Sequence, residues 1–297
     1  MAASRRARQS PAHLDYRWKA FRGILCGMGY WSEKVVLVTG GTSGLGRVIA
    51  EAFAAAGSRV VVAGLEPEGV VETVEQMTAA GFDVFGVPVD ITRQDGVDRL
   101  LDDALKRFGR LDVLVNNAGR SVRGKVLETT PEQFQALWEL NFLAMVRCTR
   151  AAVPHLLLQR GHVVNIGSLA AKSAAKYVGA YPATKHAVAA YSQQLRLELG
   201  GEGLHVLLVC PGPVARQGER LYRLEGQEDV PESARGPGAG VRVGRIDPEW
   251  LARRIVRACE RRQPELVVPA KARLLFAVAQ LWPRLGDWLV LKNMRQS

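Results

Sequence analysis

The sequence has few cysteines and no long uninterrupted apolar segment. Its four cysteines, Cys26, Cys148, Cys210 and Cys259, are far apart in the 297-residue chain, and none forms a CxxC pair. This spacing argues against zinc-binding motifs and a disulfide framework, so we expect a reducing compartment, the cytoplasm, and no metal site. No stretch reaches the ~18 uncharged apolar residues of a membrane-spanning helix. The basic N-terminus carries no cleavage signature of a signal peptide.

Acidic residues are scarce relative to basic ones. The 29 Asp and Glu against 40 Lys and Arg give a net charge of +11. Such a charge is compatible with nucleic acid, anionic lipid, an anionic cofactor, or simple solubility. Arginines are dense in residues 1–8, 216–245 and 253–262, but they are not interleaved with aromatic residues as in a single-strand-binding surface. We therefore expect a basic protein surface and no nucleic-acid partner.

From residue 33 onward, short apolar runs alternate with segments of helical periodicity. This order predicts an α/β fold, a doubly wound and mostly parallel sheet with helices on both faces, in a single domain over residues 33–270. We expect strands at 34–39, 59–63, 82–89, 111–115, 162–166, 204–209 and 266–268, and helices at 45–57, 68–80, 94–108, 131–158, 181–199 and 248–262.

Two extensions flank this domain. Residues 1–32 form a basic N-terminal extension with an aromatic-containing second half. Residues 271–297 form an apolar and basic tail that is expected to be helical and is interrupted by Pro283. The favoured interpretation of the tail is a helical cap on the domain. The alternative is an in-plane membrane contact through Leu, Phe and Trp side chains, which would make the protein peripheral at a membrane surface.

A glycine-rich loop follows the first predicted strand and precedes the first predicted helix. Its glycines allow a tight turn and close approach of the backbone to a phosphate, and the helix N-terminus offers free N–H groups. In this strand–loop–helix context the GxxxGxG spacing indicates a dinucleotide site. The residues that we expect to contact the cofactor here are Gly40, Thr42, Ser43, Gly44, Leu45 and Gly46.

The choice of nucleotide should depend on the end of the second strand. An acidic residue at position 64 would bind the ribose 2′-hydroxyl of NAD, but this position is Gly64. A basic residue at 43 or 65 would pair with the 2′-phosphate of NADP, but Ser43 and Leu65 are uncharged. Glu66 is the nearest acid, and it suits the start of the next helix. We favour NADP(H) over NAD(H).

A second group of residues carries proton-transfer chemistry. Tyr181 and Lys185 are four positions apart on a predicted helix, and therefore lie on one face. A nearby ammonium favours the phenolate and lowers the pKa of a tyrosine toward neutrality. Ser168, at the end of the strand at 162–166, could hydrogen-bond the same substrate oxygen. These residues predict a site that moves a proton during a redox reaction.

Together these residues resemble the short-chain dehydrogenase/reductase family over roughly residues 34 to 268. The separation of Ser168 and Tyr181, 181 − 168 = 13, is the usual one in that family. Any one motif occurs by chance, but their shared order is specific for the fold and the reaction class. The matching elements are the glycine loop, Asp90, Asn116-Asn117-Ala118-Gly119, Asn141, Ser168, Tyr181-x-x-x-Lys185 and Pro211-Gly212.

The resemblance implies a role for each element. Tyr181 would be the general acid or base, Lys185 would hold the nicotinamide ribose, and Ser168 would orient the substrate oxygen. Asn141 would hold a water in the proton relay. The remaining cofactor contacts implied by the resemblance are Gly64, Asp90, Ile91, Asn117, Ala118, Gly119, Pro211, Gly212 and Val214. Family members usually form homodimers or homotetramers through the helices at 131–158 and 181–199.

The sequence therefore predicts an NAD(P)-dependent oxidoreductase that acts on a small-molecule carbonyl or secondary alcohol. The Thr that often follows Pro-Gly in the family is absent, and the residues 215–246 are expected to form a substrate-lid loop. Tyr177 is expected to line the pocket. Two alternatives remain open: a catalytically silent, dinucleotide-binding regulatory protein, and a membrane-surface reductase of lipids or steroids.

Overall fold

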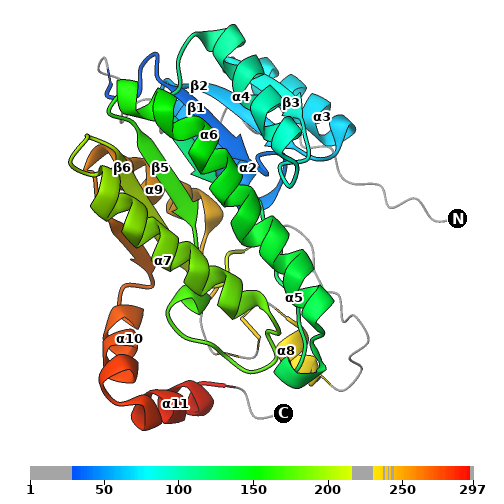
Figure 1. The fold of residues 1–297 in the computed structure, drawn as a ribbon, viewed down its shortest axis with the longest axis vertical. Helices are drawn as coiled ribbons and strands as arrows, with labels where there is room; N and C mark the ends of the chain where they lie inside the picture. The colour runs from blue at the N-terminus through cyan, green and yellow to red at the C-terminus, as the bar shows by residue number, and fades with distance from the viewer. Residues whose placement is uncertain (1–28, 216–229, 237, 240, 242–243, 295–297) are drawn as a thin grey trace, which may run out of the picture.

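The computed structural model describes residues 29–215, 230–236, 238–239, 241 and 244–294, which are built around one parallel sheet of seven strands (Figure 1). The order of strands is β3-β2-β1-β4-β5-β6-β7, and every neighbouring pair is parallel. The strands are β1 (Val35–Thr39), β2 (Arg59–Gly64), β3 (Val84–Pro88), β4 (Val113–Asn116), β5 (His162–Ile166), β6 (His205–Pro211) and β7 (Glu265–Val268).

Helices cover both faces of this sheet. Those of the strand–helix alternation are α2 (Gly44–Ala55), α3 (Pro67–Ala79), α4 (Gln94–Phe108), α6 (Ala144–Leu158), α7 (Tyr181–Leu199) and α9 (Pro248–Glu260). Apolar residues of α2 and α9 share one core cluster, whereas those of α4 and α6 share another with the opposite side of the strands. In Figure 1, α4, α6 and α7 accordingly lie in front of the sheet, with α2 and α9 behind it.

Burial on both faces explains why the strands are apolar throughout. In β1, Val36 and Val38 belong to one cluster, while Val35 and Leu37 belong to the other. Successive side chains of a strand point to opposite faces, so a strand covered on both sides needs apolar residues at every position. The predicted doubly wound parallel sheet is thus confirmed, with strand ends that differ from the prediction by at most two residues.

The helix expected over residues 131–158 has an interruption. Helix α5 (Pro131–Trp138) continues into a π-helical turn, η2 (Glu139–Leu143), before α6 begins. A capping box at Thr130 and Gln133 starts α5. A π turn is rare and is often found at functional sites, and this one contains Asn141.

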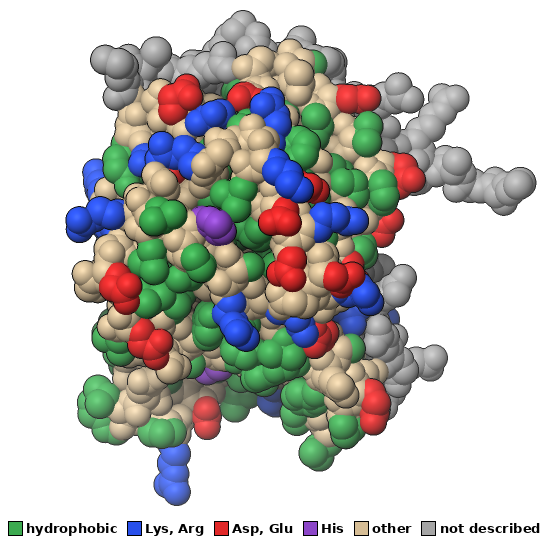
Figure 2. Space-filling model, turned by 45° about the horizontal axis from the view of Figure 1, so that its top comes forward, with side chains coloured by type: hydrophobic (Ala, Val, Ile, Leu, Met, Phe, Trp, Pro, Cys, Tyr) green, Lys and Arg blue, Asp and Glu red, His purple; other side chains and the backbone are tan. Residues whose placement is uncertain are grey.

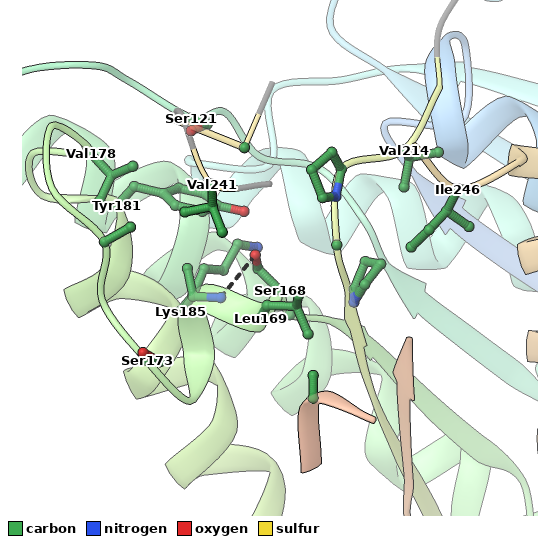
Figure 3. A pocket seen from close by; sticks show the side chains of 18 of the residues that line it. Ser121, Ser168, Leu169, Ser173, Val178, Tyr181, Lys185, Val214, Val241 and Ile246 are labelled. Carbon is green, nitrogen blue, oxygen red and sulfur yellow. Dashed lines mark hydrogen bonds between the residues drawn. The ribbon is translucent and has the colours of Figure 1, made fainter. Parts of the chain in front are cut away.

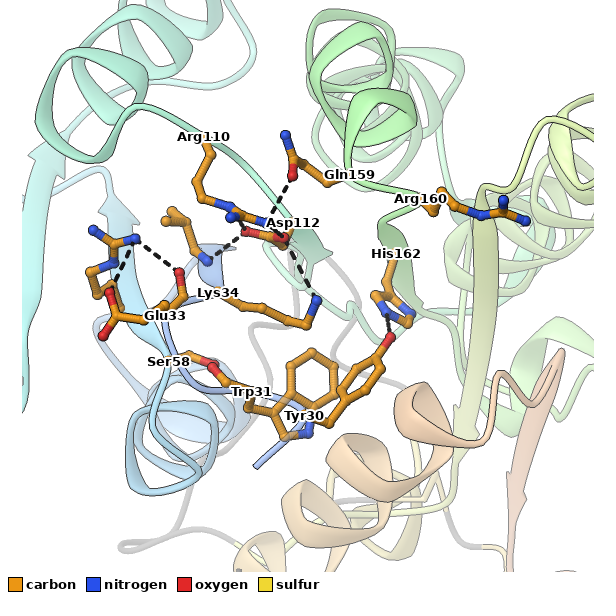
Figure 4. Close-up of polar contacts among 12 residues, drawn as sticks. Tyr30, Trp31, Glu33, Lys34, Ser58, Arg110, Asp112, Gln159, Arg160 and His162 are labelled. Atoms are coloured by element: carbon orange, nitrogen blue, oxygen red, sulfur yellow. Dashed lines mark hydrogen bonds and ion pairs between the residues drawn. The ribbon is translucent and has the colours of Figure 1, made fainter. Parts of the chain in front are cut away.

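The aromatic pair Tyr30–Trp31 anchors the chain before β1 (Figure 4). Trp31 is fully buried and packs edge-to-face on Phe53, and its indole N–H donates to a carboxylate oxygen of Glu260 at 2.6 Å. The hydroxyl of Tyr30 lies 2.7 Å from Nε2 of His162. The aromatic end of the N-terminal extension is therefore part of the folded unit, whereas residues 1–28 lie outside the described residues.

Two helices follow β7, α10 (Ala272–Leu281) and α11 (Pro283–Lys292). Ala272 and Phe276 of α10 are buried in a third cluster with residues of α7 and β6, such as Val188 and Leu208. The tail thus packs on the domain as a cap, in agreement with the favoured interpretation. Among the described helices, none is long and apolar enough to cross a membrane.

Cys148, Cys210 and Cys259 are buried free thiols, and Cys26 lies outside the described residues. Figure 2 shows one face of the molecule, on which Lys and Arg side chains lie interspersed with Asp and Glu. The excess of basic residues is therefore not gathered into a single patch on that face.

Candidate functional site

A cavity of about 740 Å³ opens at the carboxyl ends of the central strands. Figure 3 shows Ser168, Tyr181 and Lys185 close together at its wall. The position agrees with the rule that ligands of doubly wound sheets bind beyond the carboxyl ends of the strands. The predicted residues that line this cavity are Leu45, Asn117, Gly119, Ser168, Tyr181, Lys185, Pro211, Gly212 and Val214.

Helix α7 presents the Tyr181–Lys185 pair on one face. Tyr181 begins the helix, and Pro182 occupies its first turn, where the missing backbone N–H carries no cost. The Nζ of Lys185 is buried, lies 5.8 Å from the centre of the Tyr181 ring, and donates a hydrogen bond of 2.8 Å to the carbonyl oxygen of Ile166. Burial lowers the pKa of Lys185 to about 8, because it disfavours the charged form.

Ser168 stands where β5 ends. Its side chain accepts a hydrogen bond of 3.1 Å from the backbone N–H of Ala170 and so starts a short helix, η3 (Leu169–Ala171). A hydroxyl has one donor and two acceptor positions, so this bond leaves its O–H able to point at a ligand. Ser168 is half-buried and lines the cavity.

Asn141 connects the loop after β4 to helix α7. Its Oδ1 accepts from the backbone N–H of Arg120 at 2.9 Å, and its Nδ2 donates to the carbonyl oxygen of Arg120 at 2.9 Å and to Thr184 Oγ1 at 3.1 Å. The side-chain amide is therefore occupied by bonds to protein groups. If Asn141 held a relay water, as the resemblance implies, its backbone would make that contact. Asn141 is buried and does not line the cavity itself.

A buried polar network that sequence reasoning missed supports the same loop. Nδ2 of Asn116 donates to Thr149 Oγ1 at 3.0 Å and to Asn165 Oδ1 at 2.9 Å, and Asn165 Nδ2 donates to Ser192 Oγ at 2.9 Å. The network joins β4 and β5 to α6 and α7. Asn165 interrupts an apolar strand, and that is the one sequence signal that could have indicated it.

The glycine loop and Asn117 meet where the strand order reverses, between β1 and β4. Nδ2 of Asn117 donates to the carbonyl oxygens of Thr39 and Gly40, each at 3.1 Å. A Cβ at Gly46 would lie 2.2 Å from the oxygen of Gly40, and Gly40 itself has a φ of +60°. The loop is thus closed tightly by residues without side chains, which lets a pyrophosphate approach its backbone.

The residues expected to hold the cofactor fit a dinucleotide. The exposed Ser43 and Gly44 stand at the N-terminus of α2, where backbone N–H groups are free to face an anion. The residues expected to contact the adenine follow the ends of β2 and β3 and do not line the cavity. This separation suits an elongated dinucleotide, whose adenine half would lie at those strand ends while its nicotinamide half would lie in the cavity. Asp90 accepts bonds from the backbone N–H and the hydroxyl of Thr92, at 2.9 and 2.7 Å, and Ile91 is buried.

At the expected ribose end of the cofactor site, Thr42 lies close to Gly64. A Cβ at Gly64 would lie 2.5 Å from Thr42 Cγ2, so a side chain at position 64 would require Thr42 to move. Leu65 is 63% exposed and Glu66 starts α3. The absence of an acid at position 64 therefore has a packing reason.

The cavity also has a wall that the sequence did not predict. Leu275 and Phe276 of α10 and Val290 and Asn293 from the region of α11 line it, together with Val241. Tyr177, by contrast, is not among the described residues that line the cavity, and this prediction was wrong: at a φ of +63°, its backbone carbonyl accepts from Gly124 N–H.

The lid segment is described only in part. At its base, Ala215 N–H donates to the carbonyl oxygen of Ile246, and Ile246 N–H donates to that of Pro213, each at 2.8 Å. Arg123 is buried beneath it and donates to the carbonyl oxygens of Ala234 and Gly236, each at 3.0 Å. Residues 216–229, 237, 240 and 242–243 of the expected loop 215–246 lie outside the described residues.

Comparison with known proteins gives a consistent identification. The family model of the short chain dehydrogenases matches residues 34–223. A ketoacyl reductase, HetN, from Nostoc sp. is 29% identical over 89% of this chain and 92% of its own length. Dehydrogenase/reductase SDR family member 7B of Danio rerio is 32% identical over 89% of this chain and 87% of its own length.

A solved structure supports the fold and the type of cofactor. A short chain dehydrogenase/reductase from Burkholderia phymatum, in complex with NAD, is 25% identical with a TM-score of 0.74, over 86% of this chain and 95% of the other. The family match, the relatives and the parallel sheet agree with the motifs found in the sequence. The chain therefore belongs to the short-chain dehydrogenase/reductase family of nicotinamide-dependent oxidoreductases.

Proposed function

We propose that the protein reduces a ketone to a secondary alcohol, or catalyses the reverse oxidation, with Tyr181 as the general acid or base. The observation that carries this proposal is the common cavity. Tyr181 and Lys185 of α7 and Ser168 at the end of β5 line the same cavity as Asn117 and Gly119 of the expected cofactor site. A silent binding protein has no need of a proton donor at that position.

Three residues of the chain have separate roles in the proposed reduction. Tyr181 donates its phenolic proton to the carbonyl oxygen, while the hydroxyl of Ser168 donates a hydrogen bond to the same oxygen and orients it. Lys185 stabilises the phenolate that is left behind. When bound, the nicotinamide supplies the hydride that reaches the carbonyl carbon. Gly40, Gly44 and Gly46 would hold its pyrophosphate, and Lys185 its ribose. Pro211, Gly212 and Val214 would lie beside the ring.

We propose NADP(H) as the preferred nucleotide. Support comes from Gly64, where packing against Thr42 leaves no room for an acid to bind a 2′-hydroxyl. The uncharged Leu65 beside it is exposed and leaves space for a 2′-phosphate. Titration of NADPH and NADH by fluorescence measures the preference, and tighter binding of NADH would reverse it.

We also propose an assembly and a location. The domain of residues 33–270 would associate as a homodimer or homotetramer through α5, α6 and α7, whose outer faces expose Trp138, Leu158 and Leu197. Light scattering that gives a monomer would refute this. We propose a cytoplasmic protein in which residues 271–297 contact a membrane surface peripherally.

The decisive experiment combines nucleotide binding with turnover. Absorbance of the reduced nicotinamide is followed with a panel of ketones, aldehydes and acyl thioesters, for the wild type and Tyr181→Phe. We expect turnover to fall by about a hundredfold or more in the variant, with nucleotide binding retained. Tight nucleotide binding and no turnover of any carbonyl by the wild type would instead favour the silent regulatory protein.

A further inference from the structure

The two C-terminal helices form a hairpin, defined here as residues 272–292. Its helices are held together at close range, because a Cβ at the buried Gly286 would lie 2.5 Å from Cα of Ala279. Figure 1 shows the hairpin at one end of the molecule, beyond the last strand of the sheet. It is thus a small, closely packed unit at one end of the domain.

The inner side of the hairpin belongs to the catalytic cavity. Leu275, Phe276 and Val290 line the cavity that Ser168 and Tyr181 also line. Ala272 and Phe276 continue into the core cluster of α7 and β6. The hairpin is therefore one wall of the proposed substrate space. Within residues 272–292 that wall is apolar, and Lys271 and Asn293 line the cavity at its two ends.

The outer side of the hairpin exposes large apolar side chains to solvent. Of the fifteen large hydrophobic residues exposed in the described part of the chain, six lie here, so this is where exposed apolar surface is concentrated. Both tryptophans are well exposed, Trp282 at 60% and Trp288 at 52%. The other four are Leu274, Leu281, Leu285 and Leu291.

Exposed basic residues accompany this apolar surface in the sequence. Residues 271–292 contain one acid, Asp287, and four basic residues, all of them exposed: Lys271, Arg273, Arg284 and Lys292. The ammonium of Lys292 lies 4.7 Å from the centre of the Trp288 ring. Exposed Leu and Trp bordered by Lys and Arg is the pattern of a helix that lies in the interface of an anionic bilayer. Charge complementarity thus favours a lipid surface as the occupant.

We propose that the hairpin lies in the interface of an anionic membrane and admits a bilayer-resident lipid with a keto or secondary hydroxyl group into the cavity. The outer side of the hairpin would then contact the membrane, while its inner side encloses the substrate. The apolar chain of the lipid lies against Leu275, Phe276 and Val290, and its oxygen reaches Tyr181. This inference rests on the proposed function for the reaction itself.

The membrane contact is tested by flotation with full-length protein and two types of vesicle. Vesicles of phosphatidylcholine with phosphatidylglycerol should carry the wild type, and vesicles of phosphatidylcholine alone should carry less. The variant Trp282→Ser/Trp288→Ser should partition about tenfold less or worse. The matched control is Trp250→Ser, which removes a tryptophan that is 41% exposed on α9 and should float like the wild type.

Brominated lipids provide a second measurement that does not depend on flotation. They quench tryptophans that they touch, so they should quench the wild type and Trp250→Ser but not the double variant. Absence of flotation by the wild type, or equal flotation of the double variant, would overturn the proposal. A further result would also overturn it: the double variant is monomeric by light scattering, the wild type is not, and both bind vesicles equally. In that case a second copy of the chain, and not a membrane, would cover the hairpin.

The substrate class is tested by kinetics with two methyl ketones, a short one in solution and a long-chain one dissolved in vesicles. We expect kcat/KM to be higher for the long chain by about tenfold or more, since each buried methylene contributes. The double variant should lose that advantage and keep turnover of the short ketone. Turnover of the short ketone without any such advantage refutes the lipid substrate and leaves the proposed function intact. Flotation without turnover of either ketone refutes the proposed function.

Discussion

The ammonium of Lys185 donates its hydrogen bond of 2.8 Å to the carbonyl oxygen of Ile166, two residues before Ser168. The bond joins α7 to the end of β5 and so fixes the distance between the residues expected to act on the substrate. Because Lys185 is buried, its charge is poorly solvated and strongly felt by any phenolate or ribose oxygen placed beside it.

Replacing Lys185 with methionine should separate its catalytic charge from its packing. Methionine fills a similar volume, and removal of a buried charge offsets the loss of the hydrogen bond to Ile166. We therefore expect the free energy of unfolding to stay within about 1 kcal/mol of the wild type or to rise. We expect kcat/KM to fall by about a hundredfold or more. Steady-state kinetics and thermal denaturation measure the two effects. A variant that unfolds at a much lower temperature would show that the residue is chiefly structural.

The reduction rate should depend on pH through the same group. The pKa of Lys185 is about 8, below its usual 10.5, so the ammonium is present below pH 8 and is lost as the pH rises through that value. We expect kcat/KM for ketone reduction to decline above about pH 8. In Lys185→Arg the charge persists to much higher pH, so any decline that remains in that variant would come from loss of the Tyr181 proton. A wild-type profile that stays flat to pH 10 would contradict the assignment.

Gly46 should be sensitive to the addition of a single methyl group. In Gly46→Ala the new Cβ would meet the Gly40 oxygen at 2.2 Å and Asn117 Nδ2 at 2.3 Å, so the glycine loop must shift. We expect a loss of about 1–3 kcal/mol in stability and weaker binding of both nucleotides. Gly201→Ala is the matched control, since nothing lies within 4 Å of its Cβ position. Equal nucleotide affinities in the two variants would argue against a phosphate contact at this loop.

At the amino ends of β5 and β6, His162 and His205 form a buried pair whose protonation can be assigned. The Nε2 of His205 lies 2.8 Å from the carbonyl oxygen of Gln263, so it carries the hydrogen and its Nδ1 accepts. Nδ1 of His162, 2.8 Å from that acceptor, then donates, and its Nε2 accepts from Tyr30. The thiol of Cys259 lies within 4.8 Å of these atoms. Both imidazoles are therefore neutral in the fold.

This pair should make the protein less stable in acid. Burial lowers the pKa of His162 to about 3 and that of His205 to about 4, from 6.5. Between pH 4 and 6.5 the unfolded chain binds more protons than the folded one, so stability is lost as the pH falls below 6.5. We expect a loss of about 1.4 kcal/mol per pH unit and per group, measured by urea unfolding at pH 7.5, 6.5 and 5.5.

Two variants separate this effect from other titrations. His162→Gln/His205→Gln should be less stable at pH 7.5 but should lose less stability between pH 6.5 and 5.5 than the wild type. His186→Gln, at an exposed position, should keep the wild-type pH dependence. If the double variant and the wild type lost stability equally with pH, other groups would be responsible.

Local patterns were enough to predict most of the fold and several residues that line the cavity. The apolar runs at β1, β2 and β5 and the Tyr181–Lys185 spacing depend only on neighbouring residues and on the periods of strands and helices. The bonds of Asn141 within the π turn could not be predicted, because its partners Arg120 and Thr184 are distant in sequence. The same holds for Trp31, whose burial depends on Phe53 and Glu260.

The sequence by itself determined the strand–helix alternation, the glycine loop and the Tyr–Lys pair, because each of these is a property of a short segment. Only the tertiary structure decided that Phe276 and Val290 form a wall of the cavity while Trp282 and Trp288 remain outside. The C-terminal helices are apolar on more than one side, and composition cannot tell which side faces the domain. That choice depends on the close contact of Gly286 with Ala279 and on the packing of Ala272 and Phe276 in the core.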